Sequence, residues 1–120
     1  MRLLTTLSIS YINHISFVRG GGININFLML GKNVDVCFKR VLSFHFENND
    51  VEEIDDDGFE VVSTLHDYRQ LTLDEVKNCY FNVDISECKN MHIITLEGDI
   101  YLKIICEIVE IDKSPIMALL

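Results

Sequence analysis

Lysine and arginine are scarce in this 120-residue chain. It contains ten of them, and only Lys39 and Arg40 stand side by side. Contacts to nucleic-acid phosphates need clusters of these side chains, and a formal net charge of -9 repels a duplex. The glycine cluster Gly20-Gly21-Gly22 lacks the glycine spacing and the lysine of a phosphate-binding loop. We therefore expect no nucleic-acid partner.

Long apolar runs are also absent. No segment approaches the roughly 20 predominantly apolar residues of a transmembrane helix. At the N-terminus, Arg2 precedes two leucines, but threonine and serine then interrupt the apolar run, and no small-residue cleavage site follows. The sequence predicts a soluble cytoplasmic protein without a membrane partner.

Catalytic motifs are missing as well. The sequence contains no G-x-S-x-G or comparable nucleophile turn, and its four histidines lie among strand-like residues. The most polar cluster of mixed chemistry is His66-Asp67-Tyr68-Arg69, whose composition is more typical of an exposed loop than of an active site. We expect no enzymatic activity, no catalytic residue and no cofactor.

The cysteines lack the close pairing of a structural zinc site, in which ligands stand about two to four residues apart. Cys79, Cys88 and His92 follow a C-x8-C-x3-H spacing, and His66 is the available fourth ligand. This loose spacing predicts no bound metal.

Four cysteines allow two disulfides with three connectivities. Most of the four stand in apolar or strand-like surroundings, as in VDVCFKRV around Cys37 and LKIICEIV around Cys106. Free cysteine in such surroundings behaves as a small buried hydrophobe. Reduced thiols in the core are therefore favoured, and they indicate the cytoplasm.

The length and the 48% of hydrophobic residues suit one domain with one core, residues 1–120. Apolar and polar residues alternate with period two, which is typical of half-buried antiparallel strands. We predict strands at residues 7–18, 23–30, 34–38, 42–46, 59–65, 91–96 and 100–111. These segments favour a mostly β fold: an antiparallel β-sandwich, or a strongly curved sheet, of seven to eight strands with one short helix.

The connections carry turn and helix signals. Gly31-Lys32-Asn33 and Glu97-Gly98-Asp99 are typical of hairpin loops, and Lys39-Arg40 marks either a tight turn or a bulge between two strands. Thr72-Leu73-Asp74-Glu75 has the spacing of a capping box. It predicts a helix from Leu73 to about Cys79. The last long strand carries apolar residues on both faces, which is typical of a central strand.

Acidity is concentrated in one stretch, ENNDVEEIDDDGFE, from Glu47 to Glu60. It holds eight of the 19 acidic residues and no basic residue, so the rest of the chain is close to neutral. The spacing from Glu53 to Gly58 is similar to the opening of a calcium-binding EF-hand loop, but Thr64 stands where the bidentate carboxylate should be. The run is either solvated surface or a docking surface for a basic partner.

The acidic run from Asp50 to Asp57 and the closing strand YLKIICEIVEI, from Tyr101 to Ile111, resemble the immunity proteins of bacterial contact-dependent inhibition and polymorphic toxin systems. The resemblance is one of overall character and transfers no individual residue. It implies tight neutralisation of a cognate toxin domain, often a basic nuclease, whose nucleic-acid site the acidic surface would cover.

The hypothesis from the sequence is thus a protein that binds and inhibits a cognate, basic toxin domain. Its predicted contact residues are Asp50, Glu52, Glu53, Asp55, Asp56, Asp57, Phe59 and Glu60, with apolar anchors supplied by Phe59 and its neighbours. The alternative is a small accessory or ligand-binding β domain with His66, Asp67, Tyr68 and Arg69 near its pocket.

Overall fold

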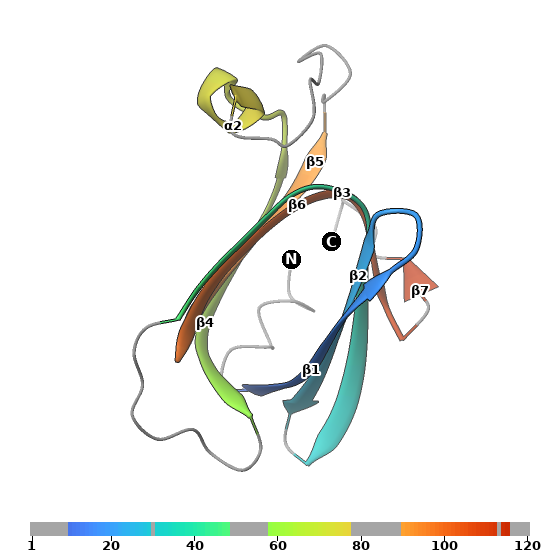
Figure 1. Ribbon diagram of the computed structural model, residues 1–120, viewed down its shortest axis with the longest axis vertical. Helices are drawn as coiled ribbons and strands as arrows, with labels where there is room; N and C mark the ends of the chain where they lie inside the picture. Colours follow the sequence, from blue (N-terminus) through green and yellow to red (C-terminus); the bar gives the residue numbers. More distant parts are fainter. Residues whose placement is uncertain (1–9, 30, 49–57, 78–89, 113, 116–120) are drawn as a thin grey trace.

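The computed structural model describes residues 10–29, 31–48, 58–77, 90–112 and 114–115. It shows a mostly β protein whose strands form one strongly curved antiparallel sheet, as the alternation predicts (Figure 1). The elements in chain order are β1 (Ser10–Val18), β2 (Gly22–Met29), β3 (Lys32–Asn48), β4 (Phe59–Arg69), α2 (Leu73–Lys77), β5 (Met91–Gly98), β6 (Ile100–Ile111) and the two-residue β7 (Ser114–Pro115).

The six longer strands close into a ring. Their order is β3-β2-β1-β4-β5-β6, and β6 also pairs with β3. The β1–β4 junction is short, with three register pairs from Ser10↔Val61 to Ile12↔Phe59. The β3–β6 junction is long, from Val36↔Ile111 to Asn48↔Ile100. The two long strands lie side by side and arch across the whole molecule, so they belong to both of its sides (Figure 1).

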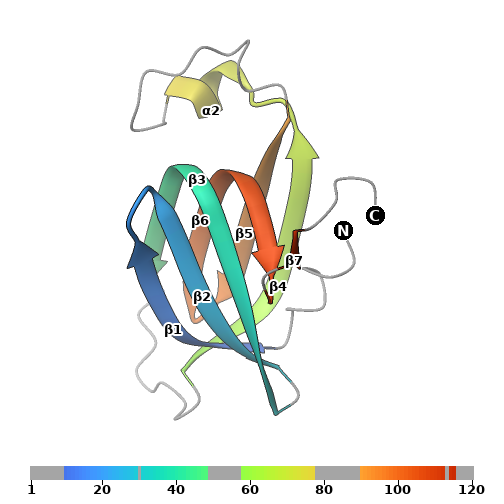
Figure 2. The same cartoon turned by 90° about the vertical axis from the view of Figure 1, so that its right-hand side faces the viewer.

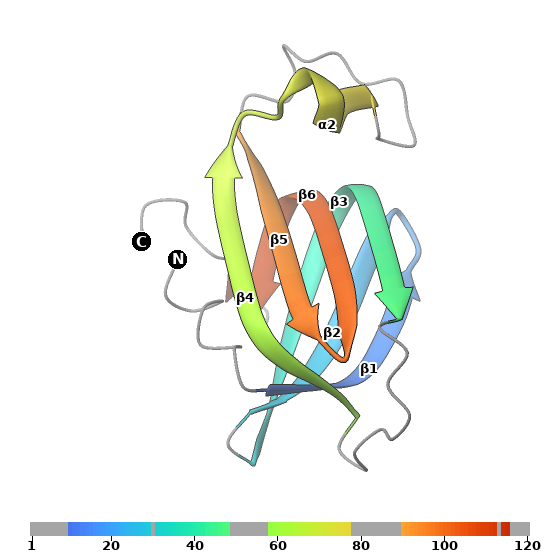
Figure 3. The same cartoon turned by 90° about the vertical axis from the view of Figure 1, so that its left-hand side faces the viewer.

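Figures 2 and 3 show these two sides. One is formed by β1, β2, the first part of β3 and the last part of β6 (Figure 2). The other is formed by β4, β5, the first part of β6 and the last part of β3, with α2 beyond the ends of β4 and β5 (Figure 3). β6 is therefore a central strand, paired with both β5 and β3, as its apolar residues on both faces predict.

The two sequence segments 34–38 and 42–46, expected as separate strands, are one strand, β3. Arg40 adopts a positive φ of 54°, and the β3–β6 register shifts between Val41 and Ser43. The strand thus continues through Lys39-Arg40 without a tight turn, and the bulge lies directly after this dipeptide, between Val41 and Ser43. A bulge increases local twist and bend, which lets β3 pass from one side of the ring to the other.

Other local signals are confirmed. Met29 pairs with Lys32 across the predicted hairpin, where Gly31 has a φ of 78°. Glu97 pairs with Tyr101 across the second hairpin. In the capping box, the Glu75 amide donates to Thr72 Oγ1 (3.2 Å), and the Thr72 amide donates to Glu75 Oε1 (2.8 Å). Strand β4 is longer than predicted and continues to Arg69.

The core fills the ring. Residues at alternate positions of every long strand point inward, and each fully buried isoleucine, leucine or phenylalanine contributes roughly 1.5–3 kcal/mol. The largest of these side chains are Phe27, Phe38, Ile25, Ile94, Leu96, Ile100, Leu102 and Ile104. The part of the chain described by the structure holds no helix with the length and hydrophobicity to span a bilayer.

A second, smaller cluster lies on the outer face of β5 and β6. Met91, Ile93 and Ile105 are buried there with Leu71, and Val76 of α2 packs against them. Arg69 binds both carboxylate oxygens of Glu75, at 2.8 and 3.0 Å. This bidentate pair lowers the pKa of Glu75 to about 2 and holds α2 against the sheet.

Candidate functional site: an acidic end of the sheet

Six of the eight predicted contact residues lie outside the described residues: Asp50, Glu52, Glu53, Asp55, Asp56 and Asp57. The other two lie at the start of β4. Phe59 points toward the core, where its ring contacts that of Phe46 edge to face at a centroid distance of 6.4 Å. Glu60 is exposed. Phe46 directly precedes the acidic stretch and Phe59 is its second-last residue. Their contact therefore brings the two ends of the stretch close together.

The structure adds two acidic residues that are distant in sequence. Asp99 lies in the β5–β6 turn, where its Oδ2 accepts a hydrogen bond from the Glu60 amide at 2.9 Å. Its own amide donates to the Glu60 carbonyl oxygen, also at 2.9 Å. Glu97 precedes this turn and pairs with both Ser63 and Tyr101.

Gly98 explains how the turn comes so close to β4. A Cβ atom at this position would overlap the Glu60 carbonyl oxygen. A residue with any side chain would therefore push the β5–β6 turn away from β4 and break the paired hydrogen bonds of Asp99. Glycine allows the close backbone approach.

These contacts create what we call the acidic end: Glu47, Glu60, Glu97 and Asp99. It includes a shallow hollow of about 480 Å³ on the outer face of the sheet. The described residues that line the hollow include no lysine or arginine; they are Glu47, Val62, Ser63, Glu97, Gly98 and Tyr101.

Neighbouring groups do little to neutralise the hollow. His45 Nε2 lies 2.9 Å from Glu47 Oε1, and both side chains are more than half exposed. Lys103 pairs with His45 in the register, but its Nζ is 3.9 Å from Glu75 Oε2, toward α2. Exposed apolar atoms of Val62 and Leu65, 59% and 60% exposed, border the acidic end on β4. Acidic groups around apolar side chains are the composition of a protein-docking surface.

The cluster His66-Asp67-Tyr68-Arg69 is divided by the sheet, because successive strand residues point to opposite faces. Asp67 and Arg69 lie on the outer face, where Arg69 binds Glu75. His66 and Tyr68 are paired with Ile94 and His92 on the inner side. Asp67, Tyr68 and Arg69 are exposed, as predicted, but the predicted loop was wrong because the cluster is part of strand β4.

The two histidines form the most unusual polar contact inside the ring. His66 Nε2 lies 2.7 Å from His92 Nδ1, and the Tyr68 ring stacks on that of His92 at 4.5 Å. Burial and the neighbouring His92 lower the pKa of His66 to about 4, and burial also lowers the pKa of His92. Both rings are neutral at pH 7, one donating and the other accepting.

The residues of the zinc-like and EF-hand-like spacings form no metal site within the described residues. Cys79 and Cys88 of the loose zinc spacing are outside the described residues, within which no group of three possible metal ligands occurs. Thr64, the last position of the EF-hand-like spacing, is buried in β4. Cys37 and Cys106 are free thiols, and burial raises the pKa of Cys106, which keeps it protonated and unreactive.

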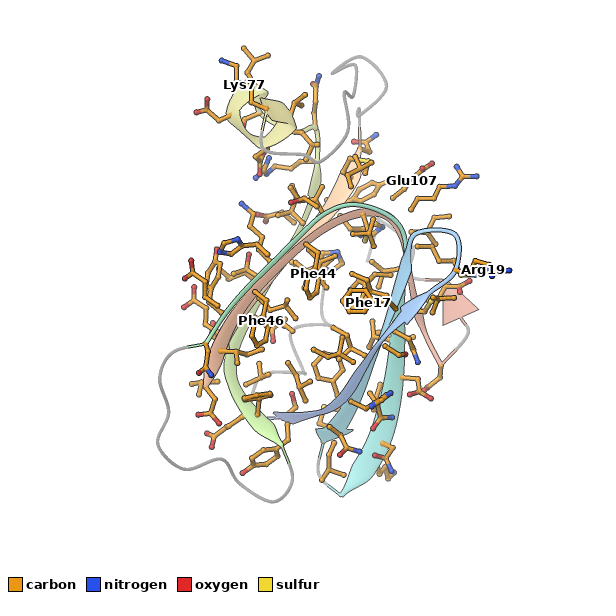
Figure 4. All side chains as sticks on the ribbon, in the orientation of Figure 1. Phe17, Arg19, Phe44, Phe46, Lys77 and Glu107 are labelled. Atoms are coloured by element: carbon orange, nitrogen blue, oxygen red, sulfur yellow. The ribbon has the colours of Figure 1, made fainter. Side chains whose placement is uncertain are left out.

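Figure 4 shows where aromatic and charged side chains lie on the ribbon. Phe17, Phe44 and Phe46 point into the space under the arch of β3 and β6, whereas Glu107 and Arg19 lie on the opposite side of the molecule from the end of β3.

No protein-family model matches this chain, and no curated protein matches it in sequence.

Proposed function

We propose that this protein is an immunity-type inhibitor that binds a cognate, basic toxin domain through its acidic end. The observation that carries the proposal is the gathering of Glu47, Glu60, Glu97 and Asp99 at one end of the sheet. Like charges held together destabilise a free protein, and an oppositely charged partner relieves the repulsion. The acidic stretch from Glu47 to Glu60, which contains the predicted contact residues, begins and ends at this acidic end.

The mode of action follows from the chemistry of such an interface. A basic nuclease domain uses lysine and arginine to hold phosphates, and the carboxylates of the acidic end offer the same cations an alternative ligand. Charge complementarity speeds the encounter, and apolar side chains such as Val62 and Leu65 then supply buried area. The inhibitor needs no catalytic group and no cofactor of its own.

The proposed compartment is the cytoplasm. Cys37 and Cys106 are free thiols in this structure, one half-buried and the other buried in the core. Reduced thiols are typical of cytoplasmic proteins, where an immunity protein would meet a toxin delivered into the cell.

The test is a pull-down from lysate of the native organism with native protein and with the double variant Glu47→Lys/Glu97→Lys. Both positions are exposed, so the variant should fold, which circular dichroism checks. The matched control is Glu107→Lys, which is also exposed and whose carboxylate lies 3.2 Å from the exposed Arg40 guanidinium. We expect a basic protein to be captured by the native protein and by the control, and lost with the double variant. Equal capture by all three proteins would refute the role of the acidic end.

A second candidate function is a ligand-binding β domain. One observation favours it: His66 Nδ1 is buried and has no hydrogen-bond partner among the described residues, which is costly unless a ligand or water satisfies it. Native mass spectrometry of the purified protein would detect a bound small molecule. Loss of that molecule in His66→Phe, with retention in His14→Gln, would support this function over the first.

A further inference from the structure

Three cationic side chains line one hollow of about 340 Å³, which we call the basic hollow. Arg19 comes from the turn between β1 and β2, and Lys39 and Arg40 come from β3. The other described residues that line it are Val18, Gly20, Gly22, Cys37 and Ile108. None of these described lining residues is acidic, in a chain with 19 acidic and ten basic residues. The hollow therefore has the opposite charge character to the acidic end.

Pairing between distant segments brings the three cations together. The β1–β2 turn lies against β3 because the Val41 amide donates a hydrogen bond to the Gly21 carbonyl oxygen, at 3.1 Å. Successive strand residues normally point to opposite faces, yet Lys39 and Arg40 both line the hollow. The positive φ of Arg40, 54°, interrupts the alternation. This conformation is unfavourable for a residue with a side chain, and such outliers are frequent at binding sites.

The hollow has hydrogen-bond donors to spare. Arg19 is exposed and forms no hydrogen bond or ion pair with any described residue. Arg40 uses only Nη1 toward Glu107, at 3.2 Å from both carboxylate oxygens. Lys39 Nζ lies 2.8 Å from one oxygen of Glu110. Because arginine carries five N–H donors and lysine three, most of the donors of the three cations are available to a ligand.

The two carboxylates do not cancel the positive charge of the basic hollow. Three cations face two carboxylates, Glu107 and Glu110, neither of which lines the hollow. The Arg40–Glu107 pair is largely exposed, at 69% and 48%, and exposed pairs of this kind are weak. Arg19 lies on the opposite side of the molecule from the end of β3 (Figure 4). Salt screens charges beyond about 10 Å, so the acidic end does little to repel an anion here.

We propose that the basic hollow binds a small phosphate monoester. A phosphate group has three terminal oxygens and up to two negative charges, which suits three converging cations. Arginine also gives paired donors that fit two phosphate oxygens. The organic part of the ligand contacts the apolar side chains of Val18 and Ile108. The volume is at the small end of the range for ligand pockets, which favours a small molecule. This inference goes beyond the inhibitor function and does not depend on it.

The test is a titration of the ¹⁵N-labelled full chain followed by ¹⁵N–¹H correlation spectra. The probe is phenyl phosphate. One control is phenol, which lacks the phosphate, and the other is inorganic phosphate, which lacks the organic part. The backbone amides of Gly20, Gly22 and Cys37 report on the hollow, because these residues line it.

We expect phenyl phosphate to shift these three amide signals and phenol to leave them unchanged. Inorganic phosphate should bind at least about threefold more weakly, because it leaves the apolar side chains of the hollow uncovered. Shifts confined to other parts of the chain, or equal responses to phenol and phenyl phosphate, would overturn the inference. Equal affinities for phenyl phosphate and inorganic phosphate would identify free phosphate as the ligand and overturn the assignment of an ester.

A matched pair of variants locates the site. Arg19→Gln removes one cation of the hollow, whereas Lys32→Gln removes a cation from the start of β3, outside the hollow. Both side chains are exposed, and neither forms an ion pair with a described residue, so both variants should fold. We expect Arg19→Gln to weaken phenyl phosphate binding at least about tenfold and Lys32→Gln to have little effect. Equal effects would indicate general charge attraction and contradict the site.

Two further variants separate the hollow from its surroundings. Glu107→Gln releases the Arg40 guanidinium from its ion pair, and we expect phenyl phosphate to bind about twofold more tightly or better. Weaker binding in this variant would contradict the role of Arg40. Glu47→Lys/Glu97→Lys, which tests the inhibitor function, should leave phenyl phosphate binding unchanged, because neither residue lines the basic hollow. The two proposals can therefore fail separately.

Discussion

The hydrogen-bonded pair of His66 and His92 predicts that stability falls as the solution is acidified. The pKa of His66 is about 4 in the folded protein, against 6.5 in an unfolded chain. The unfolded state therefore takes up a proton first as pH decreases. The stabilisation is fully present above pH 6.5 and is lost progressively toward pH 4.

The magnitude follows from the size of this difference. At about 1.4 kcal/mol per pH unit, the fall from 6.5 to about 4 corresponds to an upper limit of roughly 3 kcal/mol. His66 is only half-buried, so solvent screening reduces this figure, and we expect about 1–2 kcal/mol. His92, whose pKa is also lowered, acts in the same direction.

The assay is urea unfolding followed by circular dichroism at a series of pH values between 7 and 4. The native protein should lose stability steadily over this window, whereas His66→Phe should show a shallower slope. The control His14→Gln removes an exposed histidine and should keep the native slope. A slope that is the same in His66→Phe as in the native protein would show that the buried pair does not control acid stability.

Three further substitutions test the fold. Gly98→Ala should destabilise the protein by about 1–3 kcal/mol, because the added methyl group meets the Glu60 carbonyl oxygen; thermal unfolding measures the loss, and an unchanged melting temperature would contradict the close approach. Phe27→Ala, at a position with 0% exposure, should cost about 3–5 kcal/mol in urea unfolding. Thr72→Ala removes the hydroxyl that accepts from the Glu75 amide and should cost about 1 kcal/mol, whereas Thr72→Ser should retain most of the native stability.

Local patterns predicted most of the strands. Alternation identified β2, two apolar segments identified β5 and β6, and glycine marked the hairpins at Gly31 and Gly98, because each signal depends on neighbouring residues alone. The capping box at Thr72 and Glu75 is equally local. A bulge at Lys39-Arg40 was one of two alternatives, since a dibasic dipeptide between apolar alternations fits both a turn and a continued strand; the bulge lies directly after the dipeptide, between Val41 and Ser43.

Long-range pairing could not be predicted in the same way. Closure of the ring depends on β3 meeting β6 and on β1 meeting β4, and no short pattern encodes which strands meet. For the same reason, the sequence did not place Glu97 and Asp99 beside Glu60, or His66 beside His92. The predicted contact residues Phe59 and Glu60 lie at the acidic end, but the docking itself stays a prediction, and the acidic run between residues 49 and 57 lies outside the described residues.

The arch of β3 and β6 has a consequence for how the protein folds. The two strands join residues that are separated by the whole middle of the chain, and their pairing runs almost the full length of both. The hairpins β1–β2, β2–β3 and β5–β6 can form early, because each closes a short loop, whereas the ring cannot close until both groups of hairpins meet. Topologies dominated by such distant pairings fold on the millisecond-to-second timescale. Until the ring closes, β3 and β6 are exposed to other chains. The negative charge of the acidic stretch, which begins at the end of β3, opposes the association of such partly folded molecules.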